Sequence, residues 1–275
     1  MPELPEAETV ARQLSRYLSG KTITRVAVFA KRLREPLDLA SLARVTVGNK
    51  VEGTRRRGKF IFVDVGGGGT VLLHLGMSGT CRVCPPGTPR GRHEHVVFDL
   101  DSGESWRYVD PRRFGMVTAS PVREGAWLPA GLQTMGPEPL GDDFTATDLF
   151  ARTRRRTTPI KQLLLDQRTV AGIGNIYASE ILFRARIRPS RQAGSLSRAS
   201  CQRVVDESRA VLTEAVAMGG TTIDSHTNVD GSMGRFVQKL RVYGRAGEAC
   251  VVCDGSVKRQ VHGGRSTFYC SRCQH

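Results

Sequence analysis

The sequence predicts an α+β fold: an N-terminal helix with an antiparallel β-sandwich domain, then a helical domain that ends in a four-cysteine zinc hairpin. Short β-rich runs separated by turns fill the chain from Ile23 to about Ala119. Apolar residues at helical spacing take over after residue 143. Two Cys-x2-Cys pairs close the chain. We therefore expect three parts, at residues 1–125, 126–236 and 237–275.

The chain begins Met1-Pro2-Glu3-Leu4-Pro5-Glu6. Loss of the methionine would make the ring nitrogen of Pro2 the terminal amine, with the carboxylate of Glu3 beside it. Such an amine can attack a sugar carbon and form an iminium, as lysine does with carbonyl compounds. An α-amine with a pKa of about 8 is neutral near physiological pH far more often than a lysine with a pKa of about 10.4. An ordinary flexible terminus is the alternative.

The segment after Pro5 predicts a helix, because Val10, Leu14 and Leu18 share one helical face. The β-rich runs that follow span residues 23–29, 60–65, 71–75, 95–100 and 106–109. They do not alternate with helices as βαβ units do, and the sequence contains no P-loop or dinucleotide fingerprint. Cys81-x2-Cys84 has metal-ligand spacing, but Pro85-Pro86-Gly87 follows at once. We interpret this segment as a loop.

Basic residues gather at places that we expect to be loops of the β-rich half, at residues 55–59, 93–95 and 110–115. The segment Arg112-Arg113-Phe114 places an arginine pair before an aromatic residue, which suits phosphate contact together with insertion into a base stack. A salt-bridged corner is equally compatible with this pattern. Met77 lies in a glycine-bracketed turn and is either a second apolar wedge or a core residue.

The segment from Pro121 to Asp143 holds four prolines and several glycines, which is typical of a linker between domains. Three helices are predicted beyond it, around residues 160–164, over residues 176–183 and up to Gly219-Gly220. Asn175 can cap the second of these helices, whose N-terminal amides would then bind phosphate. An ordinary helical hairpin is the alternative. The run Arg154-Arg155-Arg156 is either a phosphate contact or a solvated face.

Cys250, Cys253, Cys270 and Cys273 form two pairs separated by sixteen residues, the spacing of a four-thiolate zinc site. The intervening residues read as two strands joined by a turn that contains Gly263 and Gly264, with Arg265 near its tip. We expect one structural zinc ion, because four thiolates leave no open position for catalysis. No organic cofactor is expected.

The chain carries 41 Lys and Arg against 26 Asp and Glu, a net charge of +15, which favours a polyanionic partner such as nucleic acid. No apolar run of about 18 residues and no signal peptide is evident. We expect a cytoplasmic monomer.

The motifs resemble bacterial formamidopyrimidine-DNA glycosylase, in the same order along nearly the whole chain. Besides the N-terminal hexapeptide and the finger, the resemblance rests on Arg57-Gly58-Lys59, His74-Leu75-Gly76-Met77, Asp110-Pro111-Arg112-Arg113-Phe114-Gly115, Gly172-Ile173-Gly174-Asn175-Ile176-Tyr177 and Val242-Tyr243-Gly244-Arg245. It implies a helix-two-turn-helix DNA-binding domain ahead of the finger. The activity that it implies is excision of 8-oxoguanine and formamidopyrimidines from damaged double-stranded DNA, followed by cleavage of the strand through β,δ-elimination.

The same resemblance implies a role for each motif residue. Pro2 would form the Schiff base with C1′ of the damaged nucleotide, Glu3 would act as general acid and proton shuttle, Lys59 would assist β-elimination, and Arg265 would grip phosphate and aid δ-elimination. The residues that would contact DNA are His74, His93, Arg112, Arg113, Arg156 and Asn175. The residues that would fill the space left by the flipped base are Met77, Arg112 and Phe114.

A lesion-capture loop is expected between Gly219 and about Gly234, with Thr221 and Thr222 as recognition contacts and Glu6 as a further base contact. One rival is an endonuclease VIII-like glycosylase for oxidised pyrimidines, which Leu4 and the space-filling set argue against. The other rival is a non-catalytic DNA-binding module, which leaves Pro2, Glu3 and Lys59 unexplained.

Overall fold

The computed structural model describes residues 2–125, 127–221 and 228–275. The chain divides into two compact units: Met1–Pro129 with Met218–Arg235, and Ala130–Ala217 with Phe236–His275. The return of Met218–Arg235 to the first unit means that the chain crosses between the units three times. The three-part division expected from the sequence stays a prediction.

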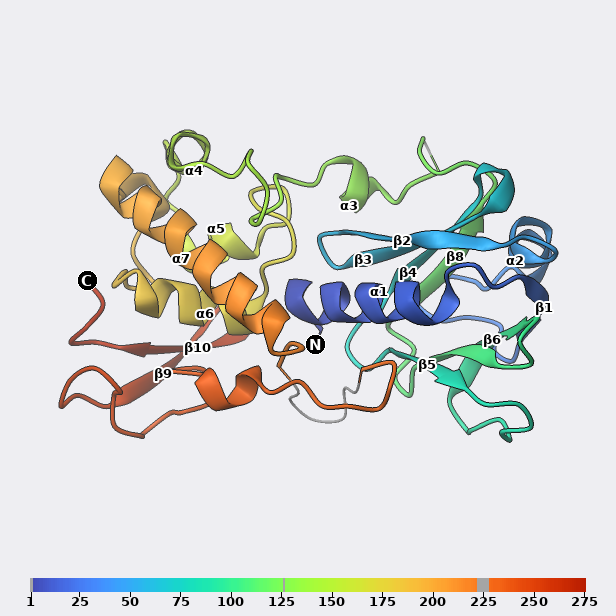
Figure 1. The fold of residues 1–275 in the computed structure, drawn as a ribbon. Helices are drawn as coiled ribbons and strands as arrows, with labels where there is room; N and C mark the ends of the chain where they lie inside the picture. The colour runs from blue at the N-terminus through green and yellow to red at the C-terminus, as the bar shows by residue number, and fades with distance from the viewer. Residues whose placement is uncertain (1, 126, 222–227) are drawn as a thin grey trace. The chain divides into compact units, whose positions relative to one another are not determined.

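In its described residues, the first unit contains two antiparallel four-stranded sheets and two helices (Figure 1). The strand order of one sheet is β1-β6-β7-β5, with β1 at Ile23–Val28, β5 at Thr80–Cys84, β6 at Glu94–Leu100 and β7 at Ser105–Val109. The order of the other is β2-β3-β4-β8, with β2 at Val51–Arg57, β3 at Phe60–Val65, β4 at Thr70–His74 and β8 at Met116–Ser120. The helices are α1 (Leu4–Leu18) and α2 (Leu39–Thr46), and Gly66–Gly68 forms the 3-10 turn η1.

One hydrophobic core holds these elements together. It contains Val10 and Leu14 from α1, Val63 from one sheet, and the stacked pair Phe98 and Trp106 from the other, whose ring centroids lie 4.3 Å apart. Burial of side chains of this size stabilises the fold by about 1.5–3 kcal/mol each. The predicted N-terminal helix and antiparallel β-sandwich are therefore confirmed, and the core fixes α1 against the sheets.

The second unit is helical and ends in a β-hairpin. Its helices are α3 (Ala130–Gln133), α4 (Ala146–Thr153), α5 (Ile160–Leu165), α6 (Asn175–Arg184) and α7 (Arg198–Ala217). Two 3-10 turns, η2 (Ala193–Ser195) and η3 (Phe236–Lys239), precede the strands β9 (Val257–His262) and β10 (Arg265–Cys270). The register pairs Arg265 with His262, so the hairpin turns at Gly263 and Gly264, both with positive φ. The hairpin predicted from the sequence is confirmed.

Three interpretations of the β-rich half are wrong, one of them in part: Glu94 and His95 lie on β6, so only His93 of residues 93–95 belongs to a loop. Cys81 and Cys84 lie on the edge strand β5, which ends before Pro85, so the prolines stop the strand without interrupting it. Residues 55–57 also belong to a strand, β2, and only Gly58 and Lys59 form the turn to β3. The helix α2 and the strands β2, β5 and β8 were not predicted, because α2 has only eight residues, β5 and β8 have five each, and β2 ends in three arginines.

Among the described residues, none of the helices combines the length and the apolar character that a membrane span would need.

Candidate active site and nucleic-acid interface

The predicted nucleophile and proton donor lie at the buried start of α1. Pro2 and Glu3 are both buried, and Glu3 is the N-cap of the helix. The backbone N–H of Glu3 donates to Oε2 of Glu6 at 2.7 Å. The other carboxylate oxygen of Glu6 accepts the backbone N–H of Thr221 at 2.6 Å. The flexible-terminus alternative is thus excluded, because packing and hydrogen bonds hold this segment.

The contacts of Glu6 differ from those expected of a base-reading residue. Glu6 is only 2% exposed, and both its carboxylate oxygens accept backbone N–H groups. It therefore joins the Pro2-Glu3 segment to Thr221, the first of the two expected recognition contacts. Thr222, the other predicted recognition contact, lies outside the described residues.

Lys59 and His74 lie at one end of the β2-β3-β4-β8 sheet. Lys59 is in the β2–β3 turn, and His74 ends β4 opposite Phe60, the residue after Lys59. Nδ1 of His74 accepts the backbone N–H of Gly76 at 3.0 Å. Burial, together with the positive charges of Lys59 and Arg34, lowers the pKa of His74 to about 4. The imidazole is therefore neutral at pH 7 with its proton on Nε2, which can donate a single hydrogen bond to a phosphate.

The three predicted space-filling residues lie on two loops that touch each other. Met77 is 42% exposed and Phe114 is 48% exposed, so Met77 is not a core residue. The guanidinium of Arg112 lies 5.0 Å from the ring centroid of Phe114. A Cβ on Gly76 would come within 2.4 Å of the backbone carbon of Phe114. Only glycine permits this close approach of the two loops.

The remaining predicted DNA contacts of the first unit lie on the same group of loops. Arg113 is exposed and has a positive φ of 57°, which turns the chain sharply before Phe114. His93 is half-buried, and its backbone carbonyl accepts the N–H of Asp110 at 3.0 Å. The structure thus brings the loops around residues 77, 93 and 112–114 together.

Asn175 is the first residue of α6, and the N-cap is Gly174. The expected asparagine cap is therefore wrong. Nδ2 of Asn175 donates instead to the carbonyl of Ser266 on β10 at 3.0 Å, while its Oδ1 is buried and has no hydrogen-bond partner among the described residues. Lys161 on α5 is 1% exposed, and its Nζ reaches the same carbonyl at 3.1 Å and Oγ1 of Thr267 at 2.9 Å. Two helices of this unit are thus hydrogen-bonded to the zinc hairpin.

Arg265 and Arg156 are both exposed. Arg265 begins β10 beside a hollow of about 260 Å³ that Gln162, Asp166 and Gly263 also line. Arg156 follows α4, and its backbone carbonyl accepts the N–H of Gly194. Both guanidinium groups are accessible to a phosphate. Asn175, Arg156 and Arg265 belong to the second unit, whereas the residues described around Pro2, Lys59 and Met77 belong to the first.

The four predicted zinc ligands form one cluster. Their Sγ atoms all lie within 4.8 Å of one another, with distances of 3.8 Å between Cys250 and Cys273 and 3.6 Å between Cys253 and Cys270. A tetrahedron with Zn–S bonds of about 2.3 Å separates its sulfurs by about 3.8 Å. The donor set therefore fits one structural zinc ion, which ties the ends of the hairpin to the loop before it.

Glu180 is a positioning residue that the sequence did not single out. It lies on α6 and is fully buried. Its Oε1 accepts the backbone N–H groups of Val242 and Tyr243 at 2.9 and 2.8 Å, and its Oε2 accepts that of Arg241 at 2.9 Å. This carboxylate holds the segment that leads into the finger. A signal was available, since Glu180 is the one charged residue between Ile176 and Phe183.

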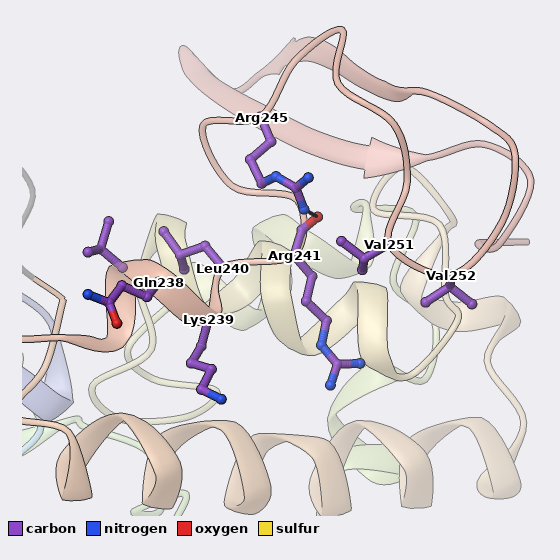
Figure 2. A pocket seen from close by; sticks show the side chains of 8 residues that line it. Gln238, Lys239, Leu240, Arg241, Arg245, Val251 and Val252 are labelled. Atoms are coloured by element: carbon purple, nitrogen blue, oxygen red, sulfur yellow. Dashed lines mark hydrogen bonds between the residues drawn. The ribbon is translucent and has the colours of Figure 1, made fainter.

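A second hollow in the helical unit, of about 680 Å³, lies apart from the predicted site residues. Figure 2 shows that Lys239 and Arg241 project from η3 and the following segment, with Val251 and Val252 on the loop before β9. None of the residues predicted for catalysis or DNA contact is among the described residues that line it. We assign it no part in the site.

Three family models match the chain in succession. They are the formamidopyrimidine-DNA glycosylase N-terminal domain at residues 1–117, the formamidopyrimidine-DNA glycosylase H2TH domain at residues 135–227, and the zinc finger found in FPG and IleRS at residues 247–275. Together they span most of the sequence.

Whole-chain relatives agree with these matches. The formamidopyrimidine-DNA glycosylases of Thioalkalivibrio sulfidiphilus and Alcanivorax borkumensis are 48% and 46% identical to this chain, each with 100% of both chains covered. A solved complex of Lactococcus lactis Fpg with DNA that contains an abasic site is 31% identical, covers 99% of both chains and has a TM-score of 0.91. The MutM (Fpg) protein of Thermus thermophilus is 38% identical, covers 99% of this chain and 98% of its own, and has a TM-score of 0.88. This chain therefore belongs to the formamidopyrimidine-DNA glycosylase family.

Proposed function

We propose that this protein is a bifunctional base-excision repair enzyme, a DNA glycosylase and abasic-site lyase that acts on oxidised purines in double-stranded DNA. The observation that carries the proposal is the buried Pro2-Glu3 terminus at the start of α1 in a chain that matches its family over its full length. The substrates that we assign are 8-oxoguanine and formamidopyrimidines.

The reaction that we propose begins with the Pro2 amine after loss of the methionine. Its lone pair bonds to C1′ of the damaged nucleotide, and the glycosidic bond breaks with its electron pair leaving on the base. Glu3 supplies and relays the protons, and the sugar opens to an iminium on Pro2. Removal of a C2′ proton then expels the 3′ phosphate in β-elimination, with Lys59 assisting. Removal of the C4′ proton then expels the 5′ phosphate in δ-elimination, with Arg265 gripping it.

The damaged nucleotide must leave the stack before this chemistry, because C1′ is inaccessible in an intact duplex. We assign Met77, Arg112 and Phe114 to the space that it leaves. The exposed apolar side chains of Met77 and Phe114 support this assignment, since insertion of such side chains unstacks a base step. Zinc takes no part in the reaction, because four thiolates leave it no open position.

Further contacts to the DNA are assigned to His74, His93, Arg113, Arg156 and Asn175. The neutral imidazole of His74 donates from Nε2, and the exposed guanidinium groups contact phosphates. As part of the same proposal, the enzyme works as a monomer in the bacterial cytoplasm, on the DNA of the nucleoid.

Borohydride reduction in the presence of an 8-oxoguanine:C duplex tests the proposal. An iminium would be trapped as a covalent protein–DNA complex, and intact mass would first establish that Met1 is absent. Pro2→Gly keeps a terminal amine and is expected to trap more slowly. Glu3→Gln should lose excision, while the exposed Glu35→Gln is the control. Absence of any trapped complex from Met-processed enzyme would instead support the non-catalytic DNA-binding module.

A competition between 8-oxoguanine:C and thymine glycol duplexes distinguishes a specificity for oxidised purines from an endonuclease VIII-like specificity for oxidised pyrimidines. Faster cleavage of the 8-oxoguanine strand is expected. Faster cleavage of the thymine glycol strand would favour an endonuclease VIII-like specificity and overturn the substrate assignment.

A further inference from the structure

The carboxylate of Asp110 hydrogen-bonds to both of the loops that carry the space-filling residues. Asp110 follows β7 and is fully buried. Its Oδ1 accepts the hydroxyl of Ser78, next to Met77, at 2.6 Å. Its Oδ2 accepts the backbone N–H of Gly115, next to Phe114, at 2.7 Å. One buried carboxylate therefore connects residues 75–79, which we call the methionine loop, with residues 110–115, which we call the arginine loop.

Ser78 completes a closed circuit between these two loops. Its Oγ donates to Asp110 and accepts the backbone N–H of Arg112 at 3.1 Å. The orientation of the Ser78 side chain thus fixes the backbone that presents Arg112. Both of these bonds use Ser78 Oγ, so removal of this hydroxyl takes away both of them, while Gly115 still donates to Asp110.

The backbone of Asp110 reaches a third segment. Its N–H donates to the carbonyl of His93 at 3.0 Å, and its own carbonyl lies 2.9 Å from Nε2 of His95. Asp110 therefore lies at the junction of three segments, and each of them carries a residue that we assign to DNA.

Close packing reinforces the junction. The hydroxyl of Tyr108 donates to the carbonyl of His74 at 3.0 Å, and a Cβ on Gly115 would lie 1.6 Å from that hydroxyl oxygen. Gly76 is also packed against the backbone of Phe114, so the backbones of the two loops are in close contact. Close-packed groups transmit a displacement to their neighbours.

We propose that Asp110, through Ser78, is a positioning residue that makes the methionine and arginine loops one rigid wedge, so that Met77, Arg112 and Phe114 enter the base stack together. The inference rests on the proposed function, since it assumes that these residues fill the space left by the flipped base. Unstacking a step costs a few kcal/mol. If one loop moved back when it entered the stack, the damaged nucleotide would return to the helix. Two loops that are hydrogen-bonded to each other resist this movement together.

Ser78→Ala tests the proposal with little risk to the fold. The control is Ser102→Ala, because Ser102 is exposed and its hydroxyl also donates to a carboxylate, that of Glu104, at 2.9 Å. Two substrates are compared: an 8-oxoguanine:C duplex in single turnover, and a preformed abasic site in single-stranded DNA. The second needs the Pro2 chemistry but presents no base stack to open.

The hydrogen bond to the buried carboxylate stabilises the loop arrangement that holds the base flipped. Loss of a bond of this kind corresponds to a rate decrease of about 10- to 100-fold. Ser78→Ala is therefore expected to slow duplex excision by about that factor and to leave single-stranded cleavage within about twofold of wild type. Excision at the wild-type rate would overturn the proposal, and so would an equal loss on both substrates, which indicates general damage. A wild-type enzyme that forms no borohydride-trapped complex would instead defeat the proposed function.

A double-mutant cycle measures whether the loops act together. Met77→Ala and Phe114→Ala are combined in the wild-type and in the Ser78→Ala background, and duplex excision is measured for each. The two effects are expected to be non-additive in the wild type, because loss of one wedge already disables the unit, and additive once Ser78 is removed. Additive effects in the wild type would overturn the proposal. Asp110→Asn should behave as Ser78→Ala does, with thermal unfolding as the check on its fold.

Discussion

His74 should be neutral throughout the physiological pH range and should destabilise the first unit only in acid. Its pKa is lowered to about 4 by burial and by the charges of Lys59 and Arg34, against about 6.5 in an unfolded chain. The unfolded state therefore binds a proton first as the pH falls. The stability linked to His74 is complete above about pH 6.5 and is lost as the pH falls toward 4. By linkage, the loss is about 2 kcal/mol at pH 5 and about 3 kcal/mol below pH 4.

His74→Asn isolates this contribution, because the side-chain carbonyl of asparagine can replace Nδ1 as acceptor for Gly76 and does not titrate. Urea unfolding of the wild type and the variant is compared at pH 8 and pH 5, and the transition that is measured is that of the first unit. The wild type is expected to lose about 2 kcal/mol relative to the variant between these two values. The pKa itself is measured by NMR titration of the imidazole Cε1 proton. A midpoint at or above 6, or a free-energy difference that does not change with pH, would refute the reasoning.

The neutral imidazole of His74 should also determine how this residue contributes to DNA binding. A neutral imidazole donates a hydrogen bond to phosphate without releasing a counterion. His74→Asn should therefore weaken binding to lesion DNA and leave the slope of log K against log salt unchanged. Arg156→Gln is the comparison, because loss of a charged phosphate contact should reduce the magnitude of that slope by about 1.

Three further predictions concern the fold and the zinc site. Glu180→Gln should cost about 3 kcal/mol in urea unfolding, because an amide cannot accept all three backbone N–H groups, whereas Glu214→Gln in a partly exposed ion pair should cost less than about 1 kcal/mol. Removal of zinc with a chelator should unfold the hairpin, as followed by circular dichroism, and abolish cleavage; cleavage that survives complete zinc loss would contradict the structural role. Gly115→Ala should destabilise by about 3 kcal/mol or more in thermal unfolding, because the new Cβ overlaps Tyr108, while Gly53→Ala meets no atom within 4 Å and serves as its control.

The features predicted correctly from the sequence are those with local signals. The helix after Pro5, the long apolar strands and the paired cysteines each depend on spacings of a few residues, which the backbone geometry of helices, strands and metal-binding turns dictates. Even so, the local signal failed where an element is short or ambiguous. The strand that contains Cys81 is followed by two prolines, and the strand that contains Arg56 ends in three arginines, so both sequences favour a loop.

The sequence predicts which residues belong to the candidate site, but it does not predict the contacts that these residues make. Asn175 illustrates the difference: its type suits a helix cap, but Gly174 takes that position and the asparagine amide bonds to Ser266 on the finger. Nothing in the sequence around Asn175 specifies a partner 91 residues away. The choice between the two hydrogen bonds was made by packing of the hairpin against α6.

By itself, the sequence determined the fold class, the zinc ligands and the chemical identity of the terminus at Pro2 and Glu3, because each is encoded in adjacent residues. Only the tertiary structure decided which groups hold that chemistry in place. The carboxylate of Glu6 accepts an N–H from a residue 215 positions away, and that of Asp110 binds a serine 32 positions away. A buried carboxylate must find donors wherever the fold places them, since leaving it without hydrogen bonds is costly. Such pairings follow from the packed core that brings distant loops together, and no local pattern records them.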